Sequence, residues 1–190
     1  MCNLCCDRIS NLKPETCNLK PERNPPRPQS RSPFTDLRSY IFGSSAAIIT
    51  DVSLIVGMGS ARTGKGPVLV GLLTIAVADN ISDSLGIHLY KESEGCGEKL
   101  TLLSTVLNFV SRLLISCTFI TIVLVLSQTQ AVLVGLIWGL LLIVLISYLL
   151  SRSNQDNPVK EIVTHVLVAV IVITLSRFLG AAIATRFHMK

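Results

Sequence analysis

Apolar residues along this chain are gathered into long runs between Tyr40 and Ala184. Each run holds about 20 residues, the number that an α-helix needs to cross the roughly 30 Å hydrocarbon layer of a membrane. A soluble core would instead show shorter runs, with polar positions recurring at the helical or strand period. The pattern therefore predicts an all-α, polytopic membrane protein. Five transmembrane helices are expected, over residues 40–60, 67–90, 100–126, 131–150 and 161–184.

The composition of the 190-residue chain agrees with a membrane protein. Its residues are 49% hydrophobic and 15% charged, against roughly 25% charged residues in a soluble domain. The formal net charge of +5 comes without a compact basic patch or interleaved aromatic residues, so no nucleic-acid partner is expected. The chain also shows no phosphate-binding glycine loop, HExxH pair or nucleophile elbow, and we expect no enzyme.

Residues 1–36 differ in character from the rest. They carry six of the eight prolines and no apolar run, a composition that cannot bury enough surface to order itself. No apolar segment follows the basic residues, as a signal peptide would require. Cys2, Cys5 and Cys6 lack a second ligand pair for zinc, and no resident cofactor is expected. We expect a disordered tail, which could reflect translation from an upstream start, ahead of a five-helix transmembrane domain over 37–190.

Basic residues indicate which side of the membrane the N-terminus faces, because Lys and Arg favour cytoplasmic segments. With the N-terminus inside, residues 1–36 and the two later cytoplasmic connections hold ten of them, and the segments on the other side hold four. Six of the ten lie in the tail, and without the tail the two sides are equal. We therefore expect a multi-pass integral membrane protein, of the plasma or inner membrane if prokaryotic, with a cytoplasmic N-terminus.

Three acidic residues lie within the predicted spans. Such residues are functional candidates by default, because a carboxylate at the bilayer centre costs about 2.5–3.5 kcal/mol on insertion scales. Asp51 lies about ten residues into the first helix, and Asp79 lies about eleven residues before the end of the second, antiparallel helix. Both are therefore expected at a similar depth from the same face. Asp83 follows Asp79 by four positions and shares its side of the helix.

Further polar residues surround these carboxylates in the second helix. Carboxylate, amide and hydroxyl oxygens suit hard divalent cations, while imidazole suits Fe²⁺ or Mn²⁺. The same carboxylates could also take up the protons that are exchanged for metal. The alternative is that these residues only join helices or face solvent. The candidate metal ligands are Asp51, Asp79, Asp83, Asn80, Ser82 and His88.

Other intramembrane positions carry weaker signals. Arg112 looks partly interfacial, because a long basic side chain can snorkel. Arg177 could pair with an intramembrane carboxylate or snorkel in the same way. Gly135 and Gly139 have the GxxxG spacing that permits close helix contact, and Gly57 could act likewise in the first helix.

The stretch from Tyr40 to Gly95 contains the frame Ile41-Phe-Gly43, Gly57, Ala78-Asp79-x-x-Ser82-x-x-Leu85-Gly86 and Lys91-x-Ser93-Glu94. With this frame the stretch resembles the first two helices of the vacuolar iron transporter family. The other three helices match that family in hydropathy only. The resemblance implies exchange of Fe²⁺ or Mn²⁺ for protons by a homodimer, with the ion path between the first helices of the two subunits and Asp79 within it.

Three departures from the family frame affect the expected substrate. Ala46 stands where the family has an acidic residue, and Asp83 stands where it has methionine. The cytoplasmic metal-binding helices are absent, which leaves only Glu92, Glu94 and Glu98 in that connection. Asp51 could restore a carboxylate to the path. Replacing a soft ligand by a hard one would favour Mn²⁺, Mg²⁺ or protons.

The sequence thus predicts a proton-coupled transporter for a divalent metal ion, iron or manganese, that works as a homodimer in the lipid bilayer. Two other functions stay open. One is a proton- or sodium-coupled carrier of another solute, which needs the carboxylates but no metal. The other is a non-transporting scaffold or accessory subunit, in which Asp51→Asn and Asp79→Asn would change folding or partner binding.

Overall fold

The computed structural model describes residues 37–93, 95, 97–154 and 158–187, so the predicted tail lies outside the described residues. Within these ranges every regular element is helical, which confirms the predicted all-α class. The elements are α1 (Leu37–Ser60), α2 (Lys65–Thr74), the π-helical segment η2 (Ile75–Asp79), α3 (Asn80–Ser93), α4 (Glu98–Val125), α5 (Gln128–Asn154) and α6 (Pro158–Arg186).

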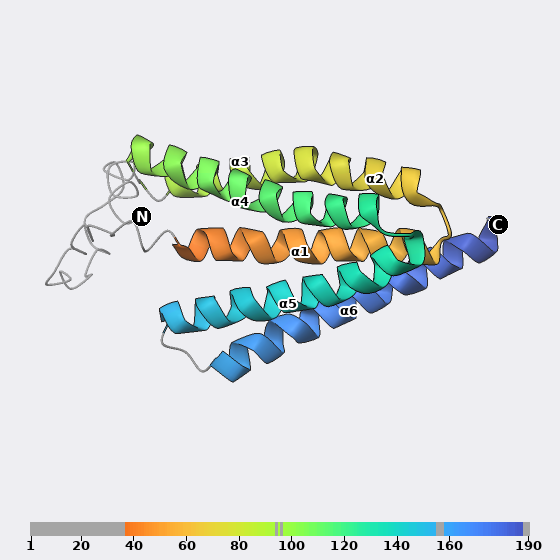
Figure 1. Cartoon of the computed structure of the whole chain (residues 1–190). Helices are drawn as coiled ribbons and strands as arrows, with labels where there is room; N and C mark the ends of the chain where they lie inside the picture. Colours follow the sequence, from red (N-terminus) through yellow and green to blue (C-terminus); the bar gives the residue numbers. More distant parts are fainter. Residues whose placement is uncertain (1–36, 94, 96, 155–157, 188–190) are drawn as a thin grey trace, which may run out of the picture. The chain divides into compact units, whose positions relative to one another are not determined.

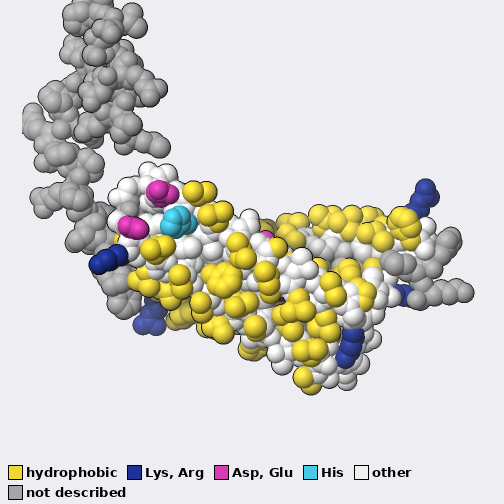
Figure 2. Space-filling view, turned by 90° about the horizontal axis from the view of Figure 1, so that it is seen from above, with side chains coloured by type: hydrophobic (Ala, Val, Ile, Leu, Met, Phe, Trp, Pro, Cys, Tyr) yellow, Lys and Arg dark blue, Asp and Glu magenta, His cyan; other side chains and the backbone are white. Residues whose placement is uncertain are grey.

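Five helical stretches are long and apolar enough to cross a membrane, as predicted. Four of them are α1, α4, α5 and α6, while α2, η2 and α3 together form the second span, Lys65–Ser93. Pro158 opens α6 and Pro67 lies in the first turn of α2, where the missing N–H would have no partner anyway. Figure 2 shows hydrophobic side chains over the middle of one face, with charged side chains mostly toward its ends. This distribution is expected of a multi-pass membrane protein.

The first span, α1, lies at the centre of the bundle. It runs between the α3–α4 pair and the α5–α6 pair (Figure 1) and contacts α2, α4, α5 and α6. In the apolar stretch Gly43–Ser60 of α1, 44% of the residues are buried inside the bundle, against 17–28% in the apolar stretches of the other four spans. Ile48, Val52, Ile55 and Val56 carry this contact into the core. The outer faces of the surrounding helices expose Leu, Ile and Val, as lipid contact requires.

Glycines allow the helices to approach α1 closely. A Cβ on Gly180 of α6 would collide with the carbonyl oxygen of Gly57, so backbones meet directly at this crossing. On α5, a Cβ on Gly139 would collide with Val52, and one on Gly135 would touch Ile55 at 3.5 Å. The predicted use of these glycines for close helix contact is confirmed, and α1 is the helix they contact.

Candidate functional site

The middle of the second span is a π-helical turn that ends at Asp79. The buried positions that flank and include it recur every fourth residue, whereas an α-helix repeats after about 3.6 residues. A regular helix would therefore rotate the later positions away from the core. One π-turn absorbs an extra residue and keeps both halves facing inward, and such turns are frequent at functional sites. The buried positions are Val68, Leu72, Ala76, Asn80 and Ser84.

Arg112 of α4 is fully buried against this turn. Its Nε donates to Asn80 Oδ1 at 2.9 Å, and its Nη2 donates to Asp79 Oδ2 at 2.6 Å. Its Nη1 lies 2.6 Å from Asp83 Oδ2 and donates to the carbonyl oxygen of Gly43 at 2.6 Å. Two other spans thus supply four oxygens to one guanidinium, whose planar fork of donors suits several acceptors at once.

The prediction that Arg112 lies partly at the membrane interface is wrong. It lies at the middle of the span Glu98–Val125, and Asp79 is the midpoint of the span Lys65–Ser93. A paired guanidinium does not need to reach the headgroups, because the carboxylates replace the stabilisation that water would give. Arg177, the other candidate partner for a carboxylate, is exposed on α6.

The two paired carboxylates face outward from the bundle. The side chains of Asp79 and Asp83 are 37% and 44% exposed, whereas the Arg112 side chain behind them is 0% exposed. A cation that approaches from the outer face would therefore meet the carboxylates before the guanidinium. Half-exposed charges at mid-span also require something other than lipid against them.

Two asparagines hold this arrangement in place. Asn80 donates from Nδ2 to the carbonyl oxygen of Ala76 at 2.8 Å, which satisfies a backbone acceptor of the π-turn and leaves Oδ1 for Arg112. Asn108, one turn before Arg112 on α4, donates to Ser84 Oγ at 3.2 Å. Both asparagines are fully buried, and the Arg112–Asn80 and Asn108–Ser84 hydrogen bonds fix α4 against the second span.

Asp51 lies on α1 and forms a separate contact with α4. Its Oδ2 accepts a hydrogen bond from Ser116 Oγ at 2.8 Å, and its Oδ1 is buried with no hydrogen-bond partner. Ser116 follows Arg112 by one helical turn on the same buried face of α4. Asp79, Asn80 and Asp83 around Arg112 form an arginine-centred cluster. Asp51 lies next to this cluster but does not share its hydrogen bonds.

The structure brings together three of the six predicted metal ligands. Asp79, Asn80 and Asp83 converge on Arg112. Ser82 is exposed on α3, and His88 contacts Thr105 Oγ1 through Nδ1 at 3.3 Å near the end of that helix. In the part of the chain that the structure describes, no three His, Cys, Asp or Glu side chains lie together as a metal-binding group.

The sequence indicated the carboxylates Asp79 and Asp83 but not the residues of α4 that contact them. The signal was present, because polar residues recur along one face of that otherwise apolar helix at steps of three or four. The same face continues with Phe119 and Val123, so its polar part ends at Ser116. The polar residues are Thr101, Ser104, Asn108, Arg112 and Ser116.

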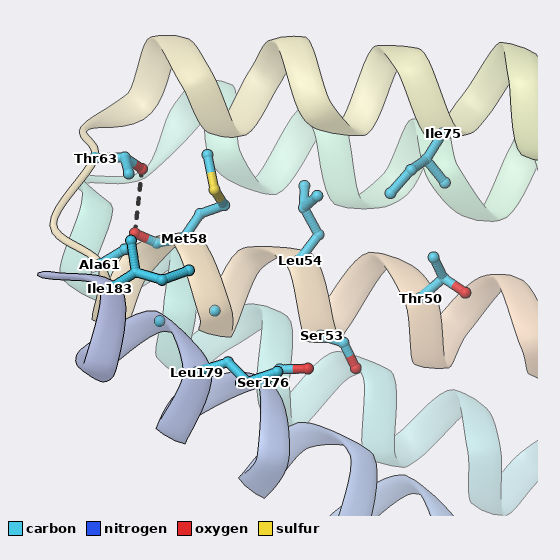
Figure 3. Close-up of a pocket in the computed structure, with 12 residues that line it drawn as sticks. Thr50, Ser53, Leu54, Met58, Ala61, Thr63, Ile75, Ser176, Leu179 and Ile183 are labelled. Atoms are coloured by element: carbon cyan, nitrogen blue, oxygen red, sulfur yellow. Dashed lines mark hydrogen bonds between the residues drawn. The ribbon is translucent and has the colours of Figure 1, made fainter. Parts of the chain in front are cut away.

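A concave feature lies apart from this cluster, between α1 and α6. It is an open groove of about 380 Å³, bordered by Leu54 and Met58 of α1 and by Leu179 and Ile183 of α6 (Figure 3). Its polar groups are hydroxyls, and Thr63 donates one of them to the carbonyl oxygen of Met58 at 3.1 Å. Among the described residues no charged side chain lines this groove, so the arginine-centred cluster is the better candidate for an ion site.

Comparison with known proteins adds no assignment to this geometry. No protein-family model, curated protein or solved structure matches the chain.

Proposed function

We propose that the protein carries a divalent metal ion across a membrane and that Asp79 and Asp83 are the carboxylates that bind the ion. The observation that carries this proposal is their position. Both lie at or near mid-span beside a π-turn, half-exposed on the outer face, with their counter-charge held behind them. A purely structural ion pair at mid-membrane would be expected to bury both partners in the bundle interior, because an ionised side chain facing hydrocarbon is costly.

The charges of the cluster and of the neighbouring Asp51 favour a divalent cargo. Asp51, Asp79, Asp83 and Arg112 together carry a formal net charge of −2 when all are ionised, and one divalent cation would cancel it. Asn80 and the two carboxylates offer oxygen donors, which suit a hard ion such as Mn²⁺. Iron or manganese, exchanged for protons, is the cargo that the family resemblance supports.

A homodimer would explain how half-exposed carboxylates persist at mid-span. Ala78, Ser82 and Gly86 are exposed beside Asp79 and Asp83, and a Cβ on Gly86 would meet nothing within 4 Å. Small residues at this spacing permit close helix contact in membranes. A second copy packed here would replace lipid with protein and enclose the ion path between subunits.

Specific observations also favour the two rival functions. A carrier of another solute is favoured because no three metal-binding side chains converge among the described residues. A scaffold is favoured because Arg112 already satisfies both carboxylates from within the chain. In a scaffold the cluster would only hold the second span against α4.

Flux measurements in proteoliposomes distinguish these functions. We expect Mn²⁺ and Fe²⁺ flux driven by an imposed pH gradient, and loss of most of that flux in Asp79→Asn. Glu92→Gln is the matched control, because Glu92 is exposed at the end of α3, about 20 Å along the second span from Asp79. Absence of metal flux from folded, correctly inserted wild-type protein would exclude the metal carrier. Equal flux in Asp79→Asn and wild type would remove Asp79 from the path.

A further inference from the structure

The guanidinium of Arg112 pairs with the same two carboxylates, Asp79 and Asp83, that a bound cation would need. Its Nη atoms lie 2.6 Å from both Asp79 Oδ2 and Asp83 Oδ2, so the carboxylates are already neutralised in part. Two cations held by the same pair of carboxylates at mid-membrane would repel each other strongly in that low dielectric. Binding of a divalent ion there therefore favours departure of the guanidinium, which must find another acceptor inside the bundle.

Asp51 of α1 can serve as this acceptor, because it lies against Ser116, one turn after Arg112 on α4. Asp51 is fully buried, and its Oδ1 has no hydrogen-bond partner, while Ser116 holds its other oxygen at 2.8 Å. Within the described part of the chain, the other buried side-chain atoms without a partner belong to Ser, Thr, Asn and Gln, so Asp51 is the carboxylate among them. It already lies within electrostatic range of Arg112.

An arginine side chain can make this change without movement of its helix. One turn of α-helix rises about 5.4 Å, which a change of rotamer along the flexible arginine stem can cover. The result would be two neutral assemblies, a divalent ion with Asp79 and Asp83, and a guanidinium with Asp51. In the ion-free arrangement Arg112 joins α4 to the second span, and in the other it would join α4 to α1 through a side chain.

From these contacts we infer that Arg112 is a two-position switch, which leaves Asp79 and Asp83 for Asp51 when a divalent cation binds. The inference rests on the proposed function. It makes Arg112 a positioning residue and Asp51 the receiver of its charge rather than a ligand of the ion. Cation binding at the second span would thereby change how α4 is tied to the central helix, which is the coupling that a carrier needs between occupancy and conformation.

A double-mutant cycle on Mn²⁺ affinity tests the switch in full-length protein in detergent. Removing the competing charge in Arg112→Gln should tighten Mn²⁺ binding about tenfold or more. Asp51→Asn should weaken binding about tenfold in the presence of Arg112 and have no effect in the Arg112→Gln background. Ser116→Ala, which keeps the carboxylate and removes only its hydrogen bond, is the matched control and should change affinity little.

The outcomes separate the switch from the proposed function. An equal effect of Asp51→Asn in both backgrounds would overturn the switch and make Asp51 a direct ligand, leaving the metal carrier standing. No Mn²⁺ binding by any folded form would overturn both. If Arg112→Gln does not fold, guanidino-¹⁵N arginine in wild-type protein with Zn²⁺ as the probe answers the same question. The buried guanidinium resonance must shift on saturation, and an unmoved resonance would overturn the switch.

Discussion

At the scale of single residues, position 112 requires an arginine and not only a positive charge. Four oxygens surround its guanidinium in different directions, and an ammonium offers only three donors from one point. Arg112 is fully buried, so loss of its carboxylate partners would leave an uncompensated charge inside the bundle. This pairing therefore contributes to folding as well as to the proposed transport. The same interactions therefore set the stability of the bundle and the charge that a substrate ion encounters.

Gly43 provides the space in which this cluster forms. Its carbonyl oxygen accepts from Arg112, and a Cβ at this position would collide with Asn108 Oδ1. We expect Gly43→Ala to lower the free energy of unfolding by about 1–3 kcal/mol through overpacking, measured by denaturation in detergent. Gly71→Ala is the control, because its Cβ would meet only the end of the Leu54 side chain at 3.1 Å. Equal stability of the two variants would contradict this account of Gly43.

The sequence identified one side of the ion pair and missed the other for a physical reason. Acidic residues such as Asp79 and Asp83 stand out in an apolar span because no snorkelling can rescue a short side chain. Arg112 did not stand out, because a long basic side chain has a second explanation at the interface. Only the packing of α4 against the second span decides between the two, and hydropathy does not contain that packing.

At the scale of elements, the π-turn places Asp79, but a chain one residue shorter would not need it for the two flanking helices to face the core. A π-turn corresponds to one residue inserted into an α-helix, and removing one residue restores the regular helix with both flanks facing as before. The buried faces of α2 and α3 would thus survive such a deletion, while Asp79 inside the turn would be displaced from Arg112.

Deleting the exposed residue Val77 from the π-turn should therefore leave a folded protein without metal flux. Deleting Leu73, which is also exposed but lies in regular α-helix, should rotate the flanking segments by about 100° and abolish folding. Size-exclusion chromatography and thermal transitions in detergent measure the folding, and Mn²⁺ uptake in proteoliposomes measures the function. If the two deletions are equally tolerated, or equally harmful, the π-turn has no separate role.

At the scale of the whole molecule, the sequence predicted the number and limits of the spans better than their arrangement. Hydropathy gave five helices because every backbone polar group in lipid must be satisfied within its own segment. It could not reveal that α1 is central, because α1 is no more apolar than the others. Its mean hydropathy of 1.3 is the lowest of the five. What centres it is small-residue contact at Gly57, Gly135 and Gly139 and the polar anchor at Asp51.

Five spans require the two loops that flank the second span to lie on opposite sides of the membrane. Gly66 is exposed at the start of α2, and Lys99 is exposed at the start of α4. With the native cysteines replaced by serine, we expect an impermeant thiol reagent to label Lys99→Cys from the cytoplasmic side and Gly66→Cys from the other, because the basic residues of 1–36 favour a cytoplasmic N-terminus. Right-side-out and inverted vesicles supply the two directions of access. Labelling of both positions from one side would contradict the second span. The reverse pattern would keep five spans but place the N-terminus outside, which would show that the basic residues of 1–36 do not determine the orientation.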